Sequence, residues 1–338
     1  MTGHEWAEQL LRQHLAMGKL RQAYLFLGAE GVGKRTLALR LAQALLCSAP
    51  PEPGAWCGNC RACRGVPRQM YSDLHSILVE EDRSQIRVDQ IRELQRQLVL
   101  APLESRCRVA LLTDFEQANE EAQNALLKTL EEPSSQAVLL LTAESGDRLL
   151  PTILSRCEVV GLKPVPTAAI RASLIERGVA PAQAALLSAL AGGRPGTAFA
   201  LQEDGARLAE RQAFLEDLRH QLGETVIARF EFAASTFSPK RSESLAQRRR
   251  RASEMLACWQ GLWRDALLAS HQARVPAVHV DSVGLVEEIC RSCAPTEIAD
   301  FLLAIGRTAE SIERYVDPLL AMEALLLDLP HLQHSAAA

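Results

Sequence analysis

The chain has 338 residues, 48% of them apolar, which suffices for two or three domains with cores of their own. The formal net charge is −4 and only 4% of the residues are aromatic, which argues against tight nucleic-acid binding by this chain alone. No apolar run reaches membrane-spanning length and no targeting segment is visible, so we expect a cytoplasmic protein without a membrane partner.

The first apolar run, residues 23–27, leads into a glycine-rich loop and then into a helical pattern at 36–46. The loop contains three glycines and a lysine: Gly28, Gly31, Gly33 and Lys34. Strand, glycine loop and helix in this order are typical of a phosphate-binding loop, because backbone N–H groups and a helix N-terminus face the phosphates and the lysine reaches the outer ones. An ordinary strand-to-helix turn is the alternative.

The residue after the loop lysine departs from the pattern of an active ATPase. A Ser or Thr at this position supplies a hydroxyl group to Mg²⁺, but the residue here is Arg35. Thr36 lies one residue further, and because a helix turns by about 100° per residue, its hydroxyl points elsewhere. The sequence therefore predicts a degenerate nucleotide site, formed by the loop with Arg35 and Thr36, at which ATP or ADP binds weakly or not at all.

A group of cysteines follows the helix after the loop. Its members are Cys47, Cys57, Cys60 and Cys63. Four thiolates at this spacing can surround one zinc ion tetrahedrally. Disulfides and buried free thiols are the alternatives, but a cytosolic setting keeps thiols reduced. We expect one structural zinc ion, because four cysteine ligands leave no position for a catalytic water.

Apolar runs and helical patterns alternate along the first half of the chain. The runs cover 23–27, 74–78, 107–113, 137–142 and 158–161, and the helical patterns cover 36–46, 88–99, 117–131 and 147–154. This alternation predicts an α/β fold in which helices cover both faces of a parallel sheet.

The helix predicted at 117–131 carries the most informative motif. The sequence Asn-Ala-Leu-Leu-Lys-Thr-Leu-Glu-Glu-Pro runs from Asn124 to Pro133, and the proline is expected to end the helix. One helix face is apolar (Ala125, Leu126, Thr129, Leu130), and polar side chains are left to meet solvent or a partner (Asn124, Lys128, Glu131, Glu132). The triplet Ser155-Arg156-Cys157 follows about two dozen residues later, where an arginine is well placed to point out of the domain.

These motifs, with the loop at 28–34 and the segment 86–92, resemble those of the delta-prime-type subunits of bacterial DNA polymerase III clamp loaders, over residues 10–330. The resemblance implies a three-domain AAA+ protein at one end of a five-membered ring, beside a gamma or tau ATPase subunit and with a delta subunit in the same complex. Such a ring opens the sliding clamp and places it on primed DNA. It belongs to a DNA-directed DNA polymerase holoenzyme, a nucleotidyltransferase, although nothing in this chain could catalyse nucleotide addition.

The resemblance also implies roles for single residues. Arg156 would be an arginine finger that reaches a phosphate bound by a neighbouring subunit. Aligned through Asn124, Thr113 stands where the family has its metal-binding Asp, and Asp114 stands where it has the water-activating Glu. A slip of one residue would instead put Phe115 at the catalytic position. Either alignment breaks the carboxylate pair, so we expect no ATP turnover by this chain.

The predicted organisation has three domains and a tail that we expect to be frayed: a P-loop AAA+ domain over 1–164 with a zinc module at 47–63, a helical lid over 165–205, a helical collar over 206–330 and a tail over 331–338. In the lid, Arg194 stands at the position of the family's nucleotide-sensing arginine, and an ordinary Gly-Pro helix boundary would look similar.

Two further patterns lie in the predicted collar. The basic run Arg248–Arg251 is interpreted as a solvated or subunit-facing helix surface. Cys290 and Cys293 have the spacing of metal ligands but lack two further ligands, so they are interpreted as helix-core cysteines.

Two other functions stay open. An active gamma-type clamp-loader ATPase would need a Ser or Thr after Lys34 and an Asp-Glu pair on the later strand. A zinc-dependent DNA-binding module would use the four cysteines and the run Arg248–Arg251, and a salt-dependent shift of DNA by the isolated chain would identify it.

Overall fold

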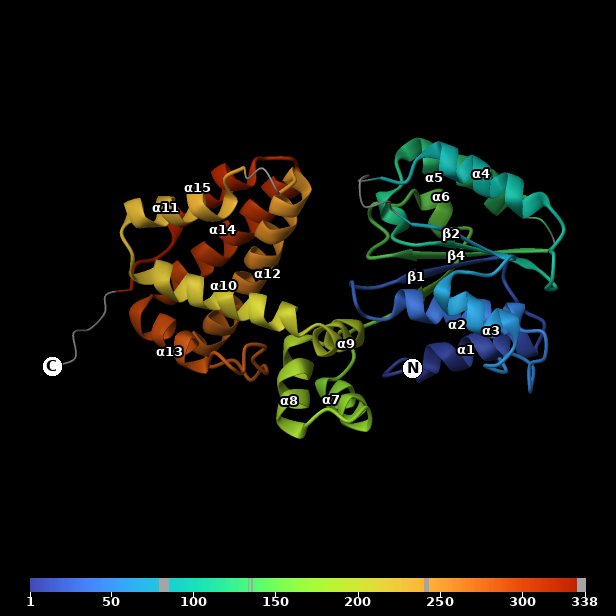
Figure 1. The fold of residues 1–338 in the computed structure, drawn as a ribbon, viewed down its shortest axis with the longest axis horizontal. Helices are drawn as coiled ribbons and strands as arrows, with labels where there is room; N and C mark the ends of the chain where they lie inside the picture. The colour runs from blue at the N-terminus through green and yellow to red at the C-terminus, as the bar shows by residue number, and fades with distance from the viewer. Residues whose placement is uncertain (79–84, 133, 135, 240–242, 333–338) are drawn as a thin grey trace. The chain divides into compact units, whose positions relative to one another are not determined.

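The computed structural model describes residues 1–78, 85–132, 134, 136–239 and 243–332 (Figure 1). The chain forms two compact units, one of residues Met1–Val179 with Gly193–Thr197, the other of Ala180–Gly192 with Ala198–Ala338. The boundaries of the three predicted domains stay a prediction.

The first unit contains the strands and the helices around them. Its elements are α1 (Glu5–Ala16), β1 (Ala23–Leu27), α2 (Lys34–Leu46), α3 (Arg61–Gly65), the 3₁₀ turn η1 (Val66–Arg68), β2 (Leu74–Ile77), α4 (Val88–Val99), β3 (Arg108–Leu112), the 3₁₀ turn η2 (Phe115–Gln117), α5 (Glu120–Glu131), β4 (Ala137–Ala143), α6 (Pro151–Leu154), β5 (Glu158–Gly161) and α7 (Thr167–Glu176).

The five strands form one parallel sheet in the order β2-β3-β4-β1-β5. β1 is paired on both sides, with β4 and with β5. Because all strands are parallel, they begin at the amino end of the sheet and finish at its carboxyl end. The glycine loop leaves β1 at the carboxyl end, where open α/β sheets bind their ligands. The predicted α/β fold is confirmed.

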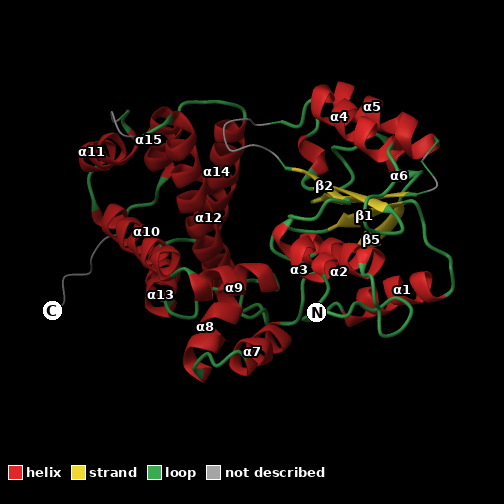
Figure 2. Cartoon of the chain, turned by 45° about the vertical axis from the view of Figure 1, so that its right-hand side comes forward, coloured by secondary structure: helices red, strands yellow, loops and turns green. Residues whose placement is uncertain are grey.

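Side chains along each strand alternate between two apolar cores. In β1, Tyr24 and Phe26 pack into the core that contains residues of α1 and α2, whereas Ala23 and Leu25 pack into the core that contains residues of α4 and α5. Helices α1 to α3 lie on one face of the sheet and α4 to α6 on the other (Figure 2). Burial on both faces explains why the central strands β1, β3 and β4 are nearly continuous apolar runs without polar alternation, whereas the edge strands β2 and β5 are partly exposed.

A buried carboxylate joins the start of β2 to the loop before β3. Asp73 is fully buried, and its Oδ1 accepts the N–H of Leu103 at 2.7 Å, while its Oδ2 accepts those of Glu104 at 2.9 Å and Ser105 at 2.8 Å. Burial acts to raise the pKa of Asp73, but the three donors outweigh it, and the pKa lies below its ordinary value.

The change Asp73→Asn is expected to lower the free energy of unfolding of the first unit by about 2–4 kcal/mol, because an amide nitrogen replaces one acceptor and leaves buried N–H groups unpaired. Because the pKa of Asp73 is lower in the folded protein than in the unfolded chain, ionised Asp73 stabilises the fold at any pH above the unfolded pKa of about 3.9. This stabilisation is lost as the pH falls through the folded-state pKa. Urea unfolding at about pH 7 and about pH 3 measures both effects. Equal stability of the two proteins at neutral pH would contradict the prediction.

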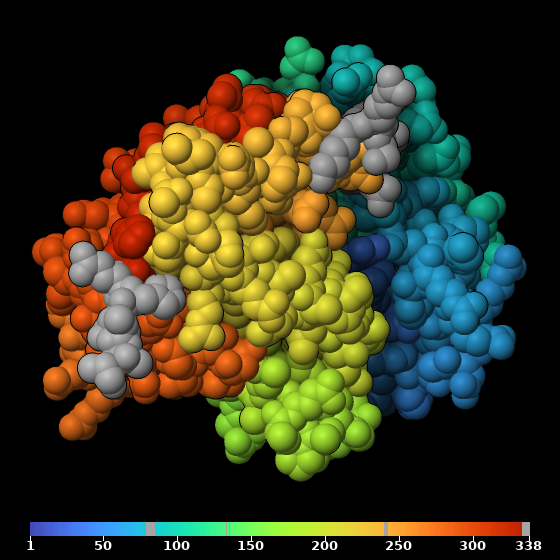
Figure 3. Space-filling model, turned by 60° about the vertical axis from the view of Figure 1, so that its left-hand side comes forward, coloured from blue at the N-terminus to red at the C-terminus, as the bar shows by residue number. Residues whose placement is uncertain are grey.

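The second unit is helical throughout the residues that the structure describes. Its elements are α8 (Pro181–Leu190), α9 (Pro195–Glu203, whose first turn belongs to the first unit), α10 (Gly205–Gly223), α11 (Val226–Phe237), α12 (Leu245–Ser270), α13 (Val283–Ser292), α14 (Pro295–Glu313) and α15 (Pro318–Asp328). Figure 3 shows the surface formed by residues of α10 and α11, coloured yellow.

Helix α12 carries the largest core side chains of this unit. Trp259 and Trp263 are fully buried, and the ring centroid of Trp263 lies 4.7 Å from that of Phe301 on α14. Cys293 is buried in the same core, and Cys290 packs against it with its thiol directed to a backbone carbonyl of α12. The interpretation of these two cysteines as helix-core residues is therefore confirmed.

Two details of the sequence interpretation need correction. The helix predicted at 147–154 shortens to α6, because the residue before a proline is disfavoured in the helical conformation and Leu150 is extended. Arg248 is not a surface residue. It is buried on the core-facing side of α12, where it donates to the carbonyl of Phe237 at 3.0 Å and lies 3.5 Å from the carboxylate of Asp317.

Among the described residues, none of the helices combines the length and the apolar character needed to cross a bilayer. Pro133 and most of the predicted tail, residues 333–338, lie outside the described residues. The expectations for the proline as a helix stop and for these tail residues therefore stay untested.

Candidate functional site

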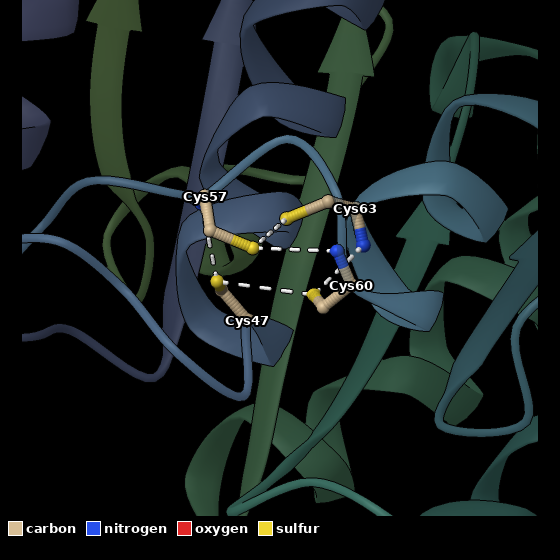
Figure 4. Close-up of side chains that lie close together, drawn as sticks. All are labelled: Cys47, Cys57, Cys60 and Cys63. Atoms are coloured by element: carbon tan, nitrogen blue, oxygen red, sulfur yellow. Dashed lines mark hydrogen bonds between the residues drawn. The ribbon is translucent and has the colours of Figure 1, made fainter.

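The four predicted metal ligands converge on one point (Figure 4). Cys47 follows the last residue of α2, and the other three come from the loop and the short helix α3 beyond it. All four Sγ atoms lie within 4.8 Å of one another, and the Sγ atoms of Cys57 and Cys63 are 3.9 Å apart, as are those of Cys47 and Cys60. Tetrahedral bonds of about 2.3 Å from sulfur to zinc require sulfur separations near 3.8 Å. The cluster can therefore hold a metal ion.

Backbone N–H groups point at the sulfurs of this cluster. The N–H of Cys57 donates to Sγ of Cys47 at 3.3 Å, that of Cys60 to Sγ of Cys57 at 3.3 Å, and that of Cys63 to Sγ of Cys60 at 3.4 Å. Burial acts to raise the pKa of Cys60, and donors from Cys63 and Ser48 outweigh it, lowering that pKa to about 6. The loop thus favours a thiolate at Cys60, which is the form that binds metals, whereas burial and the neighbouring Cys60 raise the pKa of Cys63 to about 12.

The cysteine cluster is attached to the helices on one face of the sheet. Gln43 of α2 donates to the carbonyl of Cys63 at 2.8 Å. Next to Cys57, the ring of Trp56 is contacted by the guanidinium groups of Arg12 and Arg40, at 5.4 and 5.8 Å from the ring centroid. Cation–π contacts of this kind join the loop to α1 and α2, so the cluster supports the packing of both helices.

The glycine loop has the backbone of a phosphate-binding loop, but its lysine is turned onto the loop itself. Gly28, Gly31 and Gly33 all have positive φ angles. Lys34 is buried, and its Nζ donates to the carbonyls of Gly28 at 2.6 Å and Ala29 at 3.2 Å. A bound phosphate would have to draw the ammonium group away from these carbonyls.

Two other segments of the first unit close over the loop. The N–H of Gly196 donates to the carbonyl of Gly31 at 2.7 Å, and a Cβ at Gly31 would collide with the hydroxyl of Thr197. Buried His4 hydrogen-bonds the carbonyl of Val32 through Nε2 at 3.1 Å. The loop is therefore part of the internal packing of this unit. Neither His4 nor Gly196 carried any signal in the sequence that would have indicated a contact with the loop.

The other predicted residues of the nucleotide site lie as follows. Arg35 and Thr36 are exposed on the first turn of α2. Arg194 lies beside the loop, since its Cβ is 3.5 Å from the position of a Cβ at Gly31. The structure thus brings Arg194 and the glycine loop together.

The two positions aligned with the family's carboxylates, Thr113 and Asp114, do not form a carboxylate pair at the end of β3. Thr113 is buried, and its hydroxyl donates to the carbonyl of Ile77 at 3.3 Å. Asp114 is exposed with a left-handed φ of 52°, and its N–H donates to Thr142 Oγ1 at 3.0 Å. Phe115 is fully buried in the core and cannot serve as a base. The two aligned positions thus supply one carboxylate, from Asp114, where an active ATPase needs two.

Arg156 lies at the amino end of the sheet, two residues before β5. Its Nη2 donates to Glu131 Oε1 at 2.7 Å, and its Nη1 donates to the carbonyl of Thr152 at 3.1 Å and to the hydroxyl of Ser155 at 3.4 Å. The side chain is 34% exposed and borders a surface depression of about 390 Å³ that starts beside the first residues of β1. The arginine is therefore held in place and open to a partner.

The predicted site residues fall into three separate places: the cysteine cluster at the end of α2, the glycine loop with Arg194 at the carboxyl end of the sheet, and Arg156 at its amino end. Sequence patterns gave no hint of Gln123, which is buried and bridges α5 to the segment before α6. Its amide donates to the carbonyl of Arg148 at 3.1 Å and accepts from the N–H of Leu150 at 2.9 Å.

Comparison with known proteins gives consistent matches. A family profile described as "DNA polymerase III, delta subunit" matches residues 3–166. The DNA polymerase III subunit delta' of Pseudomonas aeruginosa is 39% identical over 228 residues, which cover 67% of this chain and 69% of that protein. The subunit delta' of Escherichia coli is 28% identical over 332 residues, covering 96% of this chain and 93% of that protein.

The tau subunit of Escherichia coli DNA polymerase III is 35% identical over 178 residues, 52% of this chain and 26% of that protein. Among solved structures, a gamma subunit-related protein of Thermotoga maritima covers 96% of this chain and 97% of that chain, with a TM-score of 0.46 and 17% identity.

Proposed function

The chain belongs to the delta-prime subunit family of DNA polymerase III, and we propose that it acts in a cytoplasmic clamp loader by donating Arg156 to the ATP site of a neighbouring subunit. Its partners in this role are the gamma or tau ATPase and the delta subunit, and through the complex the sliding clamp and primed DNA. The chain itself contributes the arginine and does not hydrolyse ATP.

The observation that carries this proposal is the placement of Arg156 and the glycine loop at opposite ends of a parallel sheet. Tyr24 of β1 pairs with Glu158 and Leu27 with Gly161, so the two strands run side by side in the same direction. The arginine precedes the start of β5 and the loop follows the end of β1. A strand rises about 3.3 Å per residue, so four to five residues separate the two places by about 13–17 Å. Arg156 therefore serves a phosphate outside its own chain.

The chain's own nucleotide site supports the same function. An active site needs a hydroxyl group after the loop lysine to bind Mg²⁺, and this chain has Arg35 there. It also needs a pair of carboxylates at the end of the later strand, and this chain has Thr113, whose hydroxyl bonds a backbone carbonyl, and Asp114. A gamma-type ATPase, the alternative function, would require both the hydroxyl group after Lys34 and the carboxylate pair.

For the cysteine cluster we propose one structural zinc ion. The four sulfur atoms have the separations of a tetrahedral site, and a closed shell of four thiolates leaves no position for water. The ion would fix the loop between α2 and α3 and supply no chemistry to a reaction.

The experiment that tests the function compares ATP hydrolysis by the isolated chain with hydrolysis by a ring reconstituted with gamma or tau and delta subunits. The isolated chain is expected to show no turnover above background, because two metal-binding positions are lost. The ring is expected to hydrolyse ATP and to place the clamp on primed DNA only when this chain is included. Steady turnover by the isolated chain that Lys34→Ala abolishes would instead identify it as a motor.

A further inference from the structure

The two motifs that the sequence separates by about two dozen residues are joined by an ion pair. Arg156 Nη2 donates to Oε1 of Glu131 at 2.7 Å, and Glu131 is the last residue of α5. The other two acceptors of the guanidinium group, Thr152 and Ser155, belong to the segment that carries Arg156 itself. Glu131 is therefore the contact that fixes the arginine relative to a different element.

Helix α5 is a firm support for this contact. Leu126 and Leu130 bury one face of the helix in the core beneath the sheet. At the other end of α5, Gln123 bonds the backbone of Arg148 and Leu150, the segment that leads into α6. The segment with Arg156 is thus tied to α5 at two points.

The hydrogen bonds leave part of the guanidinium group for a ligand. Arginine has five N–H donors in a planar fork. Three bonds are formed, by two donors of Nη1 and one of Nη2, so Nε and one donor of Nη2 have no partner within the described residues. A guanidinium group that is already oriented loses less side-chain entropy when it binds a phosphate.

We propose that Glu131 is a positioning residue for Arg156, which holds the guanidinium group in the orientation that reaches a partner's phosphate. This inference rests on the proposed function of Arg156. The role explains why a carboxylate lies beside an arginine that binds an anion. The negative charge of Glu131 would repel a phosphate unless the guanidinium group of Arg156 lies between them.

The test uses reconstituted rings that contain this chain as wild type, Glu131→Ala, Glu131→Gln or Glu132→Gln. Glu131→Ala is expected to lower kcat for DNA-stimulated ATP hydrolysis by about two- to fivefold, the range for an exposed ion pair, with KM for ATP unchanged. Glu131→Gln keeps a hydrogen-bond acceptor and is expected to retain part of the activity. Glu132→Gln is the matched control, because Glu132 follows directly and makes no bond to Arg156. It is expected to behave as wild type.

A second set of rings shows whether the effect passes through the arginine. In an Arg156→Ala chain, Glu131→Ala is expected to cause no further loss, since there is no guanidinium group left to position. An equal loss in both backgrounds would overturn the inference, and so would a rise in kcat on Glu131→Ala. If the Glu131→Ala ring were as active as wild type while the Arg156→Ala ring was slow, Glu131 would have no positioning role, but Arg156 would keep its own. Full activity of the Arg156→Ala ring would remove both.

Discussion

Replacing Arg156 with alanine is expected to slow ATP hydrolysis by the reconstituted ring, with zinc content, folding and ring assembly unchanged. The side chain lies on the surface and makes hydrogen bonds only at its tip, so its removal leaves no cavity in the core. A donated arginine stabilises charge that develops on the transferred phosphoryl group, and in GTPases it is worth about 10³–10⁵ in rate. Several ATP sites share one ring, so the loss in total rate will be smaller than at the site beside this chain.

The control for this change is Arg171→Ala, which removes an exposed arginine from α7 of the same unit. Arg156→Lys tests the chemistry further, because lysine keeps the charge but lacks the planar fork, and we expect it to recover little activity. Steady-state ATPase rates and the amount of clamp on primed DNA, at matched ring concentration, measure the effect. If the Arg156→Ala and Arg171→Ala rings were equally active, Arg156 would be an ordinary surface charge.

Loss of one cysteine of the cluster is expected to remove the metal and to loosen the loop it holds. Purified chain should carry about one zinc ion, and Cys60→Ser should carry none after dialysis, because a three-thiolate site binds far less tightly than a closed shell. The loop over residues 47–63 should then be cut faster by protease. The second unit and the α4–α5 side of the sheet should persist, since their cores contain none of the four cysteines.

Cys290→Ser is the matched control for the metal experiment, since it alters a cysteine that has the same spacing to a neighbour but packs in the second unit. It should retain a full complement of zinc. Wild-type protein that is purified without chelators and contains no metal would contradict the assignment of zinc to the cluster.

The strands and most helices could be predicted because their patterns are local. The strand at 23–27 and the helix at 88–99 have the predicted limits. Long buried strands and amphipathic helices leave regular signals in the order of residues. The pattern at 147–154 predicts a helix that is too long, because Leu149 is buried from the non-helical segment before Pro151, and apolar content alone does not distinguish this from a helix.

The site could be predicted only as far as its motifs are contiguous. The four cysteines and the glycine loop are short patterns, and the structure brings each set together. The contacts of His4 and Gly196 with the loop, and that of Glu131 with Arg156, join residues far apart in sequence. Such pairs follow from the packing of whole elements, and no spacing rule anticipates them. The helix pattern therefore predicts solvent or a partner for Glu131, whereas in the structure its carboxylate contacts the arginine of the second motif.

Because the strands of the sheet are parallel, the two ends of the sheet in the first unit differ in the residues they carry. One end of the sheet carries Arg156, which we propose for a neighbour's ATP site, and the other end carries the glycine loop, where a phosphate of the chain's own nucleotide would bind. In this chain two carbonyls of that loop already have partners, since the N–H of Gly196 bonds the carbonyl of Gly31 and the ring of His4 bonds that of Val32. If ATP hydrolysis needs this loop free, a series of ATPases that are each activated by an arginine of the following member would end at this subunit.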